Sequence, residues 1–497
     1  MEFYSIYFLL FFIPVFLLNY VIGAKDRKYL LFAASSVFIL SFNLLSLVLV
    51  FVLSVIFYFL ARYINEKNHS FLLFSGIIIS IVAFIGSKYL NAIGDLDSLK
   101  YSLLVFKNSN YTNSIIFPIG LSFYLFQSLS YLIETGRKNI IPERNFINFF
   151  NYLIYFPKFV AGPIERPNKL LSQLKGDVVF DYKNVTDGLK LIAFGMFQKF
   201  IIADSIKRIP DAVFYNPDKF PGFFILIGVF LLSVQIYADF AGYTNMAIGF
   251  SKTLGIELSP NFRQPYFSTS IKDFWSRWHI TLSLWIRDYV FLPLAYKITK
   301  LFNHQKKHAV KPESITYVVS ILIAMTLVGV WHGIGWPFVL WGAMHGSLLA
   351  LSFLTKKPRA KIIKYFNIGA SLLKSLRVIF TFLIITSLWV FFRADTFYTA
   401  MKVFTGLFSG WHLSLFNVMS LKRYIYLFGI SRLDIAVIIV SVILIFIYDL
   451  IDSKVGVLNL LSRTSSFKRW AFYYIILLSL LFFGTLNNIQ NFIYQQF

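Results

Sequence analysis

Hydrophobic runs close to membrane-spanning length recur along the whole chain, with short polar stretches between them. A transmembrane helix needs about 20 predominantly apolar residues to cross the hydrocarbon of a bilayer. Twelve candidate segments are 3–22, 29–42, 44–61, 71–87, 115–133, 187–205, 221–242, 315–332, 336–354, 377–393, 434–452 and 470–488. Several are short or contain Pro and Gly, as at Pro118 and Gly120, so broken or tilted helices are expected. The pattern predicts an all-α polytopic membrane protein with about 11–12 transmembrane helices.

The basic residues between these runs set the predicted orientation, because cytoplasmic loops carry an excess of Lys and Arg. With the N-terminus outside, the predicted cytoplasmic segments are 24–29, 62–69, 134–145, 250–312 and 355–377. The last of these has seven Lys or Arg and no acidic residue. Predicted outer segments such as 88–114 and 394–433 carry fewer basic residues for their length. The positive-inside rule therefore favours this arrangement.

Two stretches depart from a simple series of spans. Residues 145–167 are apolar, but Pro157, Lys158 and Pro163 stand where a span would continue, which predicts a re-entrant hairpin entering from the cytoplasm. Residues 250–312 are semi-polar and predict cytoplasmic amphipathic segments. No internal repeat, low-complexity tract or linker is visible, so residues 1–497 are interpreted as a single membrane-embedded domain.

Composition supports the membrane assignment and narrows the chemistry. Hydrophobic residues make up 57% of the chain and charged residues 14%, whereas soluble chains carry about 25% charged residues. The formal charge is +24, and the Lys and Arg residues lie between the apolar runs. This distribution indicates membrane topology and contact with anionic lipid. No nucleic acid partner is expected. The absence of cysteine excludes disulfides and an acyl-cysteine intermediate. The first run lacks a basic start and a cleavage site, so it is interpreted as a retained span.

The segment 273–294 contains the first group of candidate functional residues. Large apolar side chains recur in it at spacings typical of one helix face, namely Trp275, Trp278, Leu282, Trp285 and Tyr289. His279 is expected at the edge of this stripe, with Arg277 on another side of the predicted helix. Taken alone, the pattern favours an interfacial helix anchored by an aromatic belt. Both interpretations of His279, structural and functional, remain open.

The second group is the pair His332 and His345 in VGVWHGIGWPFVLWGAMHG, at membrane depth. An ionisable side chain there is costly and marks a site or pathway by default, although a neutral histidine can also tie two helices together. Nearby Gly329 and Gly333 allow close approach of backbone or substrate, which favours a functional role for His332. The other histidines fall in probable loops and are interpreted as solvated, namely His69, His304, His308 and His412.

A third group lies in or beside the run at 233–250 and includes Asp239 and Asn245. Asp239 is interpreted as a charge paired with a basic neighbour or as an acceptor for a helix end. The chain lacks GxSxG, P-loop, GxGxxG and HExxH motifs, which removes the usual signals of serine hydrolases, NTP-driven enzymes, dinucleotide enzymes and zinc proteases. We therefore expect neither a metal nor a tightly bound cofactor.

Histidine without a serine elbow or a cysteine indicates direct acyl transfer. A neutral imidazole removes the proton of an acceptor hydroxyl, which then attacks an activated acyl carbonyl. Donors to the resulting oxyanion could come from Trp indoles such as that of Trp331, from Asn245 or from backbone N–H groups beside the glycines.

Ordered motifs along nearly the whole chain resemble the membrane-bound O-acyltransferase family, in particular its branch that modifies bacterial polysaccharides. They are FPIGLSFYLFQSLSYLIE (117–134), YFPKFVAGPIERP (155–167), QIYADFAGYTNMAIG (235–249), NFRQPYFSTSIKDFWSRWHITLSLWIRDYVFLPL (261–294), GVWHGIGWPFVLWGAMHG (329–346), WVFFRAD (389–395) and FIYQQF (492–497). By this resemblance His332 corresponds to the family's catalytic histidine and His279 to its second active-site position. The resemblance also implies a ring of helices around a central tunnel. The chain departs from the pattern at Asn245, where an acidic residue is expected.

The leading hypothesis is an O-acetyltransferase in the cytoplasmic (inner) membrane of a bacterium. It would use acetyl-CoA and pass acetyl across the membrane to an extracytoplasmic polysaccharide, through a partner acetyltransferase protein. Arg277, Trp278 and Arg287 would shape the donor end, because basic residues suit a phosphorylated donor. The alternatives are D-alanyl transfer from a carrier protein, a proton-coupled transporter or flippase using His332 and Asp239, and a structural anchor of a glycan-synthesis complex.

Overall fold

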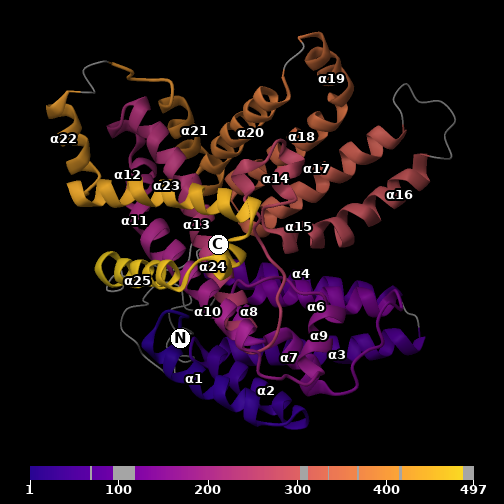
Figure 1. Ribbon diagram of the computed structural model, residues 1–497. Helices are drawn as coiled ribbons and strands as arrows, with labels where there is room; N and C mark the ends of the chain where they lie inside the picture. Colours follow the sequence, from indigo (N-terminus) through magenta and orange to yellow (C-terminus); the bar gives the residue numbers. More distant parts are fainter. Residues whose placement is uncertain are drawn as a thin grey trace. The chain divides into compact units, whose positions relative to one another are not determined.

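The computed structural model describes residues 1–67, 70–92, 118–302, 312–333, 335–366, 369–412 and 417–484. Every regular element in these ranges is a helix (Figure 1), so the prediction of an all-α protein is confirmed for them. A helix satisfies its own backbone hydrogen bonds, which hydrocarbon requires. His69, His304 and His308 lie outside the described residues, whereas His412 is described and exposed, as expected for a loop.

The described chain contains seven helices that are long and apolar enough to cross a membrane. They are α3 (Leu44–Lys67), α13 (Gly222–Thr253), α17 (Pro312–His332), α18 (Trp336–Leu354), α20 (Ala370–Arg393), α23 (Arg432–Lys454) and α25 (Ser466–Phe483). Helix α1 (Ile6–Val21) and the apolar part of α4 (Ser70–Ala92) are shorter. The other predicted spans correspond to α2 (Ala24–Leu40), α6 (Leu121–Gly136), and α10 (Tyr182–Met196) with the π-helix η1 (Phe197–Ala203). The multi-pass prediction is confirmed, and the larger count of spans stays a prediction.

The described residues form two compact units. The first comprises residues 1–194 and 243–259, and the second comprises residues 195–242 and 260–497. Helix α13 contributes its longer N-terminal part to the second unit and its C-terminal part to the first. The single acyltransferase domain, and the ring and tunnel that the family resemblance implies, stay predictions.

The first unit has an aromatic core built by α1, α2, α8 (Phe156–Phe159) and the end of α13. The ring of Phe250 meets those of Phe8 and Phe12 edge to face, each at 4.8 Å between centroids. Phe156 packs against Phe38 at 5.8 Å on the other side. Such edge-to-face pairs stabilise a core beyond the area they bury.

The apolar stretch 145–167 forms short helices in place of one span. Helix α7 (Phe146–Ile154) begins at Asn145, whose side chain accepts hydrogen bonds from two backbone N–H groups, and α8 follows after a single residue. Pro157 stands in the first turn of α8, where a missing N–H costs nothing. The interruption expected from the prolines is confirmed, and entry from the cytoplasm stays a prediction.

Buried polar groups secure the segment between α7 and α9 (Pro167–Lys175). Lys158 is fully buried, and its Nζ donates to Gln127 Oε1 and, at 3.1 Å, to the Leu153 carbonyl. Glu165 is also buried and accepts hydrogen bonds from the backbone N–H and the hydroxyl of Ser259. Because buried charges are tolerated only with such partners, these bonds fix the path of the chain.

The second unit is organised around the hairpin of α17 and α18, which lie side by side (Figure 1). A β-carbon on Gly329 would collide with the Phe338 carbonyl and come within 3.1 Å of Gly342, and one on Gly342 would collide with the Met325 carbonyl. Small residues at such a crossing let two helix backbones approach closely. Gly329 therefore serves helix packing. The close approach that the sequence suggested for backbone or substrate is here an approach of the α18 backbone.

The prediction of one continuous helix over 273–294 is wrong. The chain forms α14 (Ile271–Trp275), α15 (Ile280–Ile286), the π-helix η4 (Arg287–Phe291) and then α16 (Leu292–Phe302). His279 lies in the break with φ 41° and ψ 54°, a left-handed conformation that costs a residue with a side chain roughly 1–2 kcal/mol. Asn261 offsets this cost, since its carbonyl accepts from Ile280 N–H and its side chain accepts from Thr281.

Candidate active site

Three histidines and a set of large aromatic rings form one continuous cluster inside the second unit. They come from the end of α17, the first half of α18, the end of α20 and the segment from α14 to α15. We call them the histidine–tryptophan cluster, which consists of His279, His332, His345, Trp275, Trp278, Trp331, Trp341, Trp389 and Phe392. The cluster joins residues that are more than one hundred positions apart in the sequence.

His332 is the last residue of α17 and is buried, with 4% of its surface exposed. Its ring lies edge to face with Trp341, at 5.2 Å between centroids, and with Phe392, at 5.0 Å. The close crossing of α17 and α18 brings the two sides of the hairpin together at this point. The imidazole is thus held between rings of α18 and α20, a setting that restricts its rotation.

His345 lies on α18, and the Trp341 ring separates it from His332. The Trp341 centroid is 4.8 Å from that of His345 and 5.2 Å from that of His332. The indole Nε1 of Trp275 donates to His345 Nδ1 at 3.2 Å. A neutral imidazole that accepts at Nδ1 carries its proton on Nε2. His345 therefore ties α18 to α14, as the structural interpretation expects, and its Nε2–H is a buried donor.

The cluster contains buried polar atoms that no other described residue satisfies. The indole Nε1 atoms of Trp341 and Trp389, and Nε2 of His345, are buried and have no hydrogen-bond partner among the described residues. Leaving a buried polar group unbonded costs about 1–3 kcal/mol. The Trp341 and Trp389 rings stack at 5.7 Å between centroids, so both indoles are part of the same cluster. An oxygen atom of a bound acyl group would satisfy such donors.

His279 reaches the cluster through Trp331. The ring centroid of Trp331 is 6.4 Å from that of His279 and 4.6 Å from that of His332. The other face of His279 packs edge to face on Phe240 at 4.8 Å. Burial lowers the pKa of His279 to about 3, so the ring is neutral at physiological pH. A neutral imidazole with so low a pKa positions other groups and is a weak general base.

Of the three residues expected at the donor end, only Trp278 belongs to the cluster. It is buried and stacks on Phe274 at 5.4 Å, with Trp389 at 5.0 Å. Arg277 pairs with Asp273 at 2.7 Å, and Arg287 pairs with Asp288 at 2.7 Å. Among the described residues neither guanidinium contacts a histidine of the cluster.

Asp239 and Asn245 both lie on α13 but fall in different units. Asp239 is buried and pairs with Lys199 of η1 at 2.7 Å, and Lys199 also pairs with Asp204 at 2.9 Å. The interpretation of Asp239 as a charge paired with a basic neighbour is therefore confirmed. Asn245 is half-buried in the first unit, and its action on the acyl group stays a prediction.

Sequence reasoning missed Trp341 and Trp389. Each stands in an apolar run, where an indole is read only as a hydrophobic group. The available signal was the density of Trp in WHGIGWPFVLW and its recurrence in WVFFRAD. Tryptophan carries a donor that needs a partner when buried, so a buried Trp beside a histidine is a candidate for ligand contact.

A buried cluster of histidines in a multi-pass helical protein is typical of one class, the membrane proteins with a functional site among their helices. Comparison with known sequences narrows this class. The profile of the MBOAT, membrane-bound O-acyltransferase family, matches residues 6–390. The chain belongs to this family, which confirms the resemblance seen in its motifs, and it is an acyltransferase.

The names of the relatives agree on acyl transfer and differ in the group transferred and the acceptor. The chain is 32% identical to "Probable alginate O-acetylase AlgI" of Azotobacter vinelandii, over 90% of this chain and 85% of the relative. It is 30% identical to "Peptidoglycan O-acetyltransferase" of Helicobacter pylori, over 80% of this chain and 78% of the relative. It is 31% identical to "Teichoic acid D-alanyltransferase" of Bacillus subtilis, over 48% of this chain and 59% of the relative.

Proposed function

We propose that this protein is an O-acetyltransferase that moves acetyl from cytoplasmic acetyl-CoA across a bacterial inner membrane for O-acetylation of an extracytoplasmic polysaccharide. The observation that carries the proposal is the buried arrangement of His332, Trp341 and His345. It occurs in a chain that aligns over 90% of its length with a probable alginate O-acetylase. Membership of the family removes the transporter and the purely structural anchor as leading alternatives.

In the proposed reaction His332 is the general base. Its neutral imidazole takes the proton of the acceptor hydroxyl while the hydroxyl oxygen attacks the thioester carbonyl. The tetrahedral intermediate then expels the CoA thiolate, which receives the proton from His332. A positioned base contributes about 10²–10⁴-fold to such a step.

The oxyanion of that intermediate needs donors in a site without water. The buried indole N–H groups of Trp341 and Trp389 are suited to this role, because they have no other partner among the described residues. One positioned oxyanion donor contributes about 10²–10³-fold. The Nε2–H of His345, fixed by the bond from Trp275, is a third candidate.

The remaining predicted site residues take positioning and donor roles in the proposal. Trp331 packs on the imidazole of His332, and neutral His279, at the start of α15, packs on Trp331. Trp278 packs on the ring of Trp389. Arg277 and Arg287 stay candidates for the phosphates of CoA, because both are partly exposed in the segment predicted to face the cytoplasm.

Two kinds of partner follow from the proposed reaction. The acetyl group would reach the polysaccharide through an extracytoplasmic acetyltransferase protein, and the exposed apolar faces of the spanning helices would contact lipid. D-alanyl transfer is the second candidate, since one relative is named for it. The shorter alignment with that relative, 48% of the chain, favours acetyl.

The experiment that tests the proposal compares the two donors directly. Full-length protein in lipid nanodiscs is given an oligosaccharide hydroxyl acceptor and either acetyl-CoA or a D-alanylated carrier protein, and release of free thiol is measured. We expect turnover of acetyl-CoA that is lost in His332→Ala and kept in His412→Ala, whose histidine is exposed in a loop. Turnover of the carrier alone, or full acetyl-CoA turnover by a correctly inserted His332→Ala protein, would overturn the assignment.

A further inference from the structure

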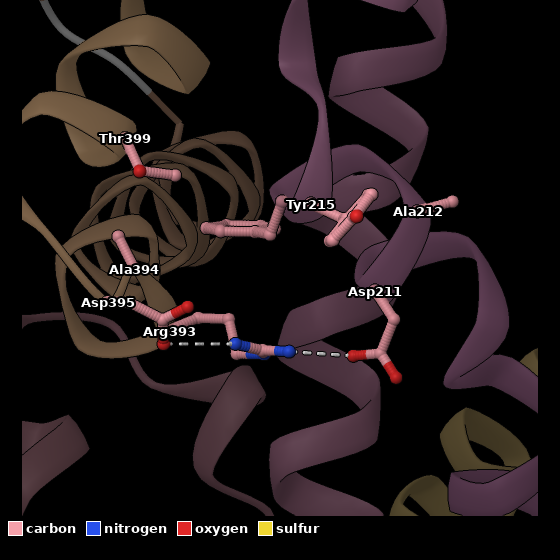
Figure 2. A pocket seen from close by; sticks show the side chains of 8 residues that line it. Asp211, Ala212, Tyr215, Arg393, Ala394, Asp395 and Thr399 are labelled. Atoms are coloured by element: carbon pink, nitrogen blue, oxygen red, sulfur yellow. Dashed lines mark hydrogen bonds and ion pairs between the residues drawn. The ribbon is translucent and has the colours of Figure 1, made fainter.

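A pocket of about 380 Å³ opens in the second unit, and its lining shares no residue with the histidine–tryptophan cluster. It lies between α12 (Arg208–Tyr215) and the turn from α20 to α21 (Phe397–Gly406). The lining residues are Asp211, Ala212, Phe214, Tyr215, Arg393, Ala394, Asp395 and Thr399 (Figure 2). Ligand pockets in proteins commonly measure about 300–1,000 Å³, so this one is large enough for a single sugar ring.

Arg393 lines the pocket, and its guanidinium contacts three neighbouring side chains. Its guanidinium donates to Asp211 Oδ1 at 2.8 Å and lies 3.9 Å from Asp395 Oδ1 (Figure 2). It also lies over the ring of Phe214, 5.8 Å from the centroid. Two carboxylates and one guanidinium leave the lining with an excess of one negative charge. The positive charge of Arg393 is thus already compensated within the protein.

The rim offers the groups that recognise a sugar. Tyr215 is 90% exposed, and the side chain of Asp395 is 93% exposed. Thr399 adds a hydroxyl that shares a hydrogen bond with Thr396. A pyranose presents an apolar C–H face, which packs on an aromatic ring, and hydroxyls at its edge, which bond to carboxylate and hydroxyl groups. A large aromatic ring exposed next to fixed polar groups fits this pattern.

One wall of the pocket belongs to the predicted outer segment 394–433, and the other lies between the predicted spans 187–205 and 221–242, which the same topology puts on the outer face. With the N-terminus outside, residues 206–220 and 394–433 are both extracytoplasmic. The structure joins these segments independently of that rule. Lys402 pairs with Asp218, and Gly222 N–H donates to the Ser409 carbonyl at 2.8 Å. An acceptor glycan is on this side of the membrane.

We infer that the pocket binds a neutral pyranose unit of the acceptor glycan, with Tyr215 against the ring face and Asp395 and Thr399 bonding its hydroxyls. This inference rests on the proposed function, because it assigns the class of glycan that the partner acetyltransferase modifies, held here beside that partner. A uronate would bring a carboxylate toward Asp211 and Asp395 while Arg393 is already paired. The pocket therefore selects neutral sugars over uronates.

The test measures oligosaccharide binding to the full-length protein in nanodiscs by saturation-transfer difference NMR, without acetyl-CoA. The probes are maltotetraose, cellotetraose, chitotetraose, mannotetraose and tetramannuronate. We expect at least one neutral probe to bind and tetramannuronate to bind more weakly. Tyr215→Ala should weaken the neutral probe about tenfold, as expected for loss of one stacked ring. Tyr426→Ala, which removes an equally exposed tyrosine outside the pocket, should leave binding unchanged.

A second variant tests the role of charge. Asp395→Asn keeps the size of the side chain and removes one negative charge, so tetramannuronate binding should rise several-fold while the neutral probe changes less than about twofold. Binding of tetramannuronate equal to or tighter than that of every neutral probe in the unmodified protein overturns the inference. Equal loss of binding in Tyr215→Ala and Tyr426→Ala overturns it as well.

Failure of the pocket and failure of the proposed function give different results. No oligosaccharide binding together with normal acetyl-CoA turnover refutes the pocket alone. Binding without any acetyl-CoA turnover refutes the acetyl donor and leaves the pocket standing. If no probe binds but Tyr215→Ala blocks glycan acetylation in cells, the pocket is a docking site for a protein, and the sugar assignment is wrong.

Discussion

His332 and His279 belong to the same cluster, but the regions that hold them are built in opposite ways. His332 ends an uninterrupted helix of 21 residues, and its place follows from the close crossing of α17 and α18. His279 lies in a left-handed break between two short helices, and its place follows from hydrogen bonds to Asn261. The first histidine is positioned by packing and the second by polar bonds at some cost in backbone strain. Substitutions in the two regions should therefore impair different properties of the protein.

The largest difference is expected in catalysis. His332→Ala should lower acetyl transfer by about 10²–10⁴-fold, because it removes the proposed base. His279→Ala should cost about tenfold or less, since neutral His279 acts only through Trp331 and positioning effects are smaller. Single-turnover thiol release from each variant checks the ranking. A His279→Ala protein that is as inactive as His332→Ala would place both histidines in the chemical step.

A substitution at Trp341, on the hairpin, distinguishes the contribution of its ring packing to catalysis from the contribution of its indole N–H. Trp341→Phe keeps a ring between His332 and His345 but deletes the buried N–H, so kcat should fall by about 10–10²-fold while KM changes little. Trp470→Phe, at an exposed indole on α25, is the matched control. An unchanged kcat in Trp341→Phe excludes this N–H as an oxyanion donor.

The helix crossing itself can be broken with a single methyl group. Gly329→Ala places a β-carbon against the Phe338 carbonyl and Gly342, which should destabilise the protein by about 1–3 kcal/mol. Gly369→Ala serves as control, because nothing lies within 4 Å of its β-carbon. Thermal unfolding in nanodiscs measures both. Equal melting temperatures for the two variants would show that the crossing has room to adjust.

The last effect concerns the break around His279 and is seen only in acid. The pKa of His279 is about 3 in the folded protein because of burial, below its ordinary value of 6.5. The unfolded chain therefore binds the extra proton between these values, so the stability linked to His279 is complete above pH 6.5 and is lost as pH falls. At pH 5 the loss is about 2 kcal/mol. His279→Gln should melt with less sensitivity to acid than the unmodified protein, and equal sensitivity would mean that His279 is solvated.

The hairpin was predictable from sequence and the break was not. An apolar run of spanning length ending in His332 defines α17, because hydrocarbon leaves a helix as the only solution. The period of Trp275, Trp278 and Leu282 instead predicts a continuous helix, and long-range bonds to Asn261 override it. A local pattern contains no information about an acceptor that folding brings from elsewhere.

The same limit applies to the candidate site. The family resemblance placed His332 and His279 in one active site, and both lie in the cluster, together with Trp331 and Trp278. The sequence could not place Trp341 or Trp389, whose importance arises only when their N–H groups are buried without partners in the described structure. The sequence predicted that Asp239 pairs with a basic residue, but it did not identify Lys199 as the partner. Lys199 lies in the π-helix η1, which no sequence pattern indicated.

The two unbonded indoles of Trp341 and Trp389 have a practical consequence for the laboratory. Indole vibrational and fluorescence spectra respond to hydrogen bonding at nitrogen. If these two N–H groups donate to the acyl group, as proposed, arrival of an acyl ligand can be observed optically, with no label and before any bond is made or broken. Comparing the spectra with those of Trp341→Phe and Trp389→Phe assigns the signal to each ring. The spectral change then reports directly whether the site is occupied.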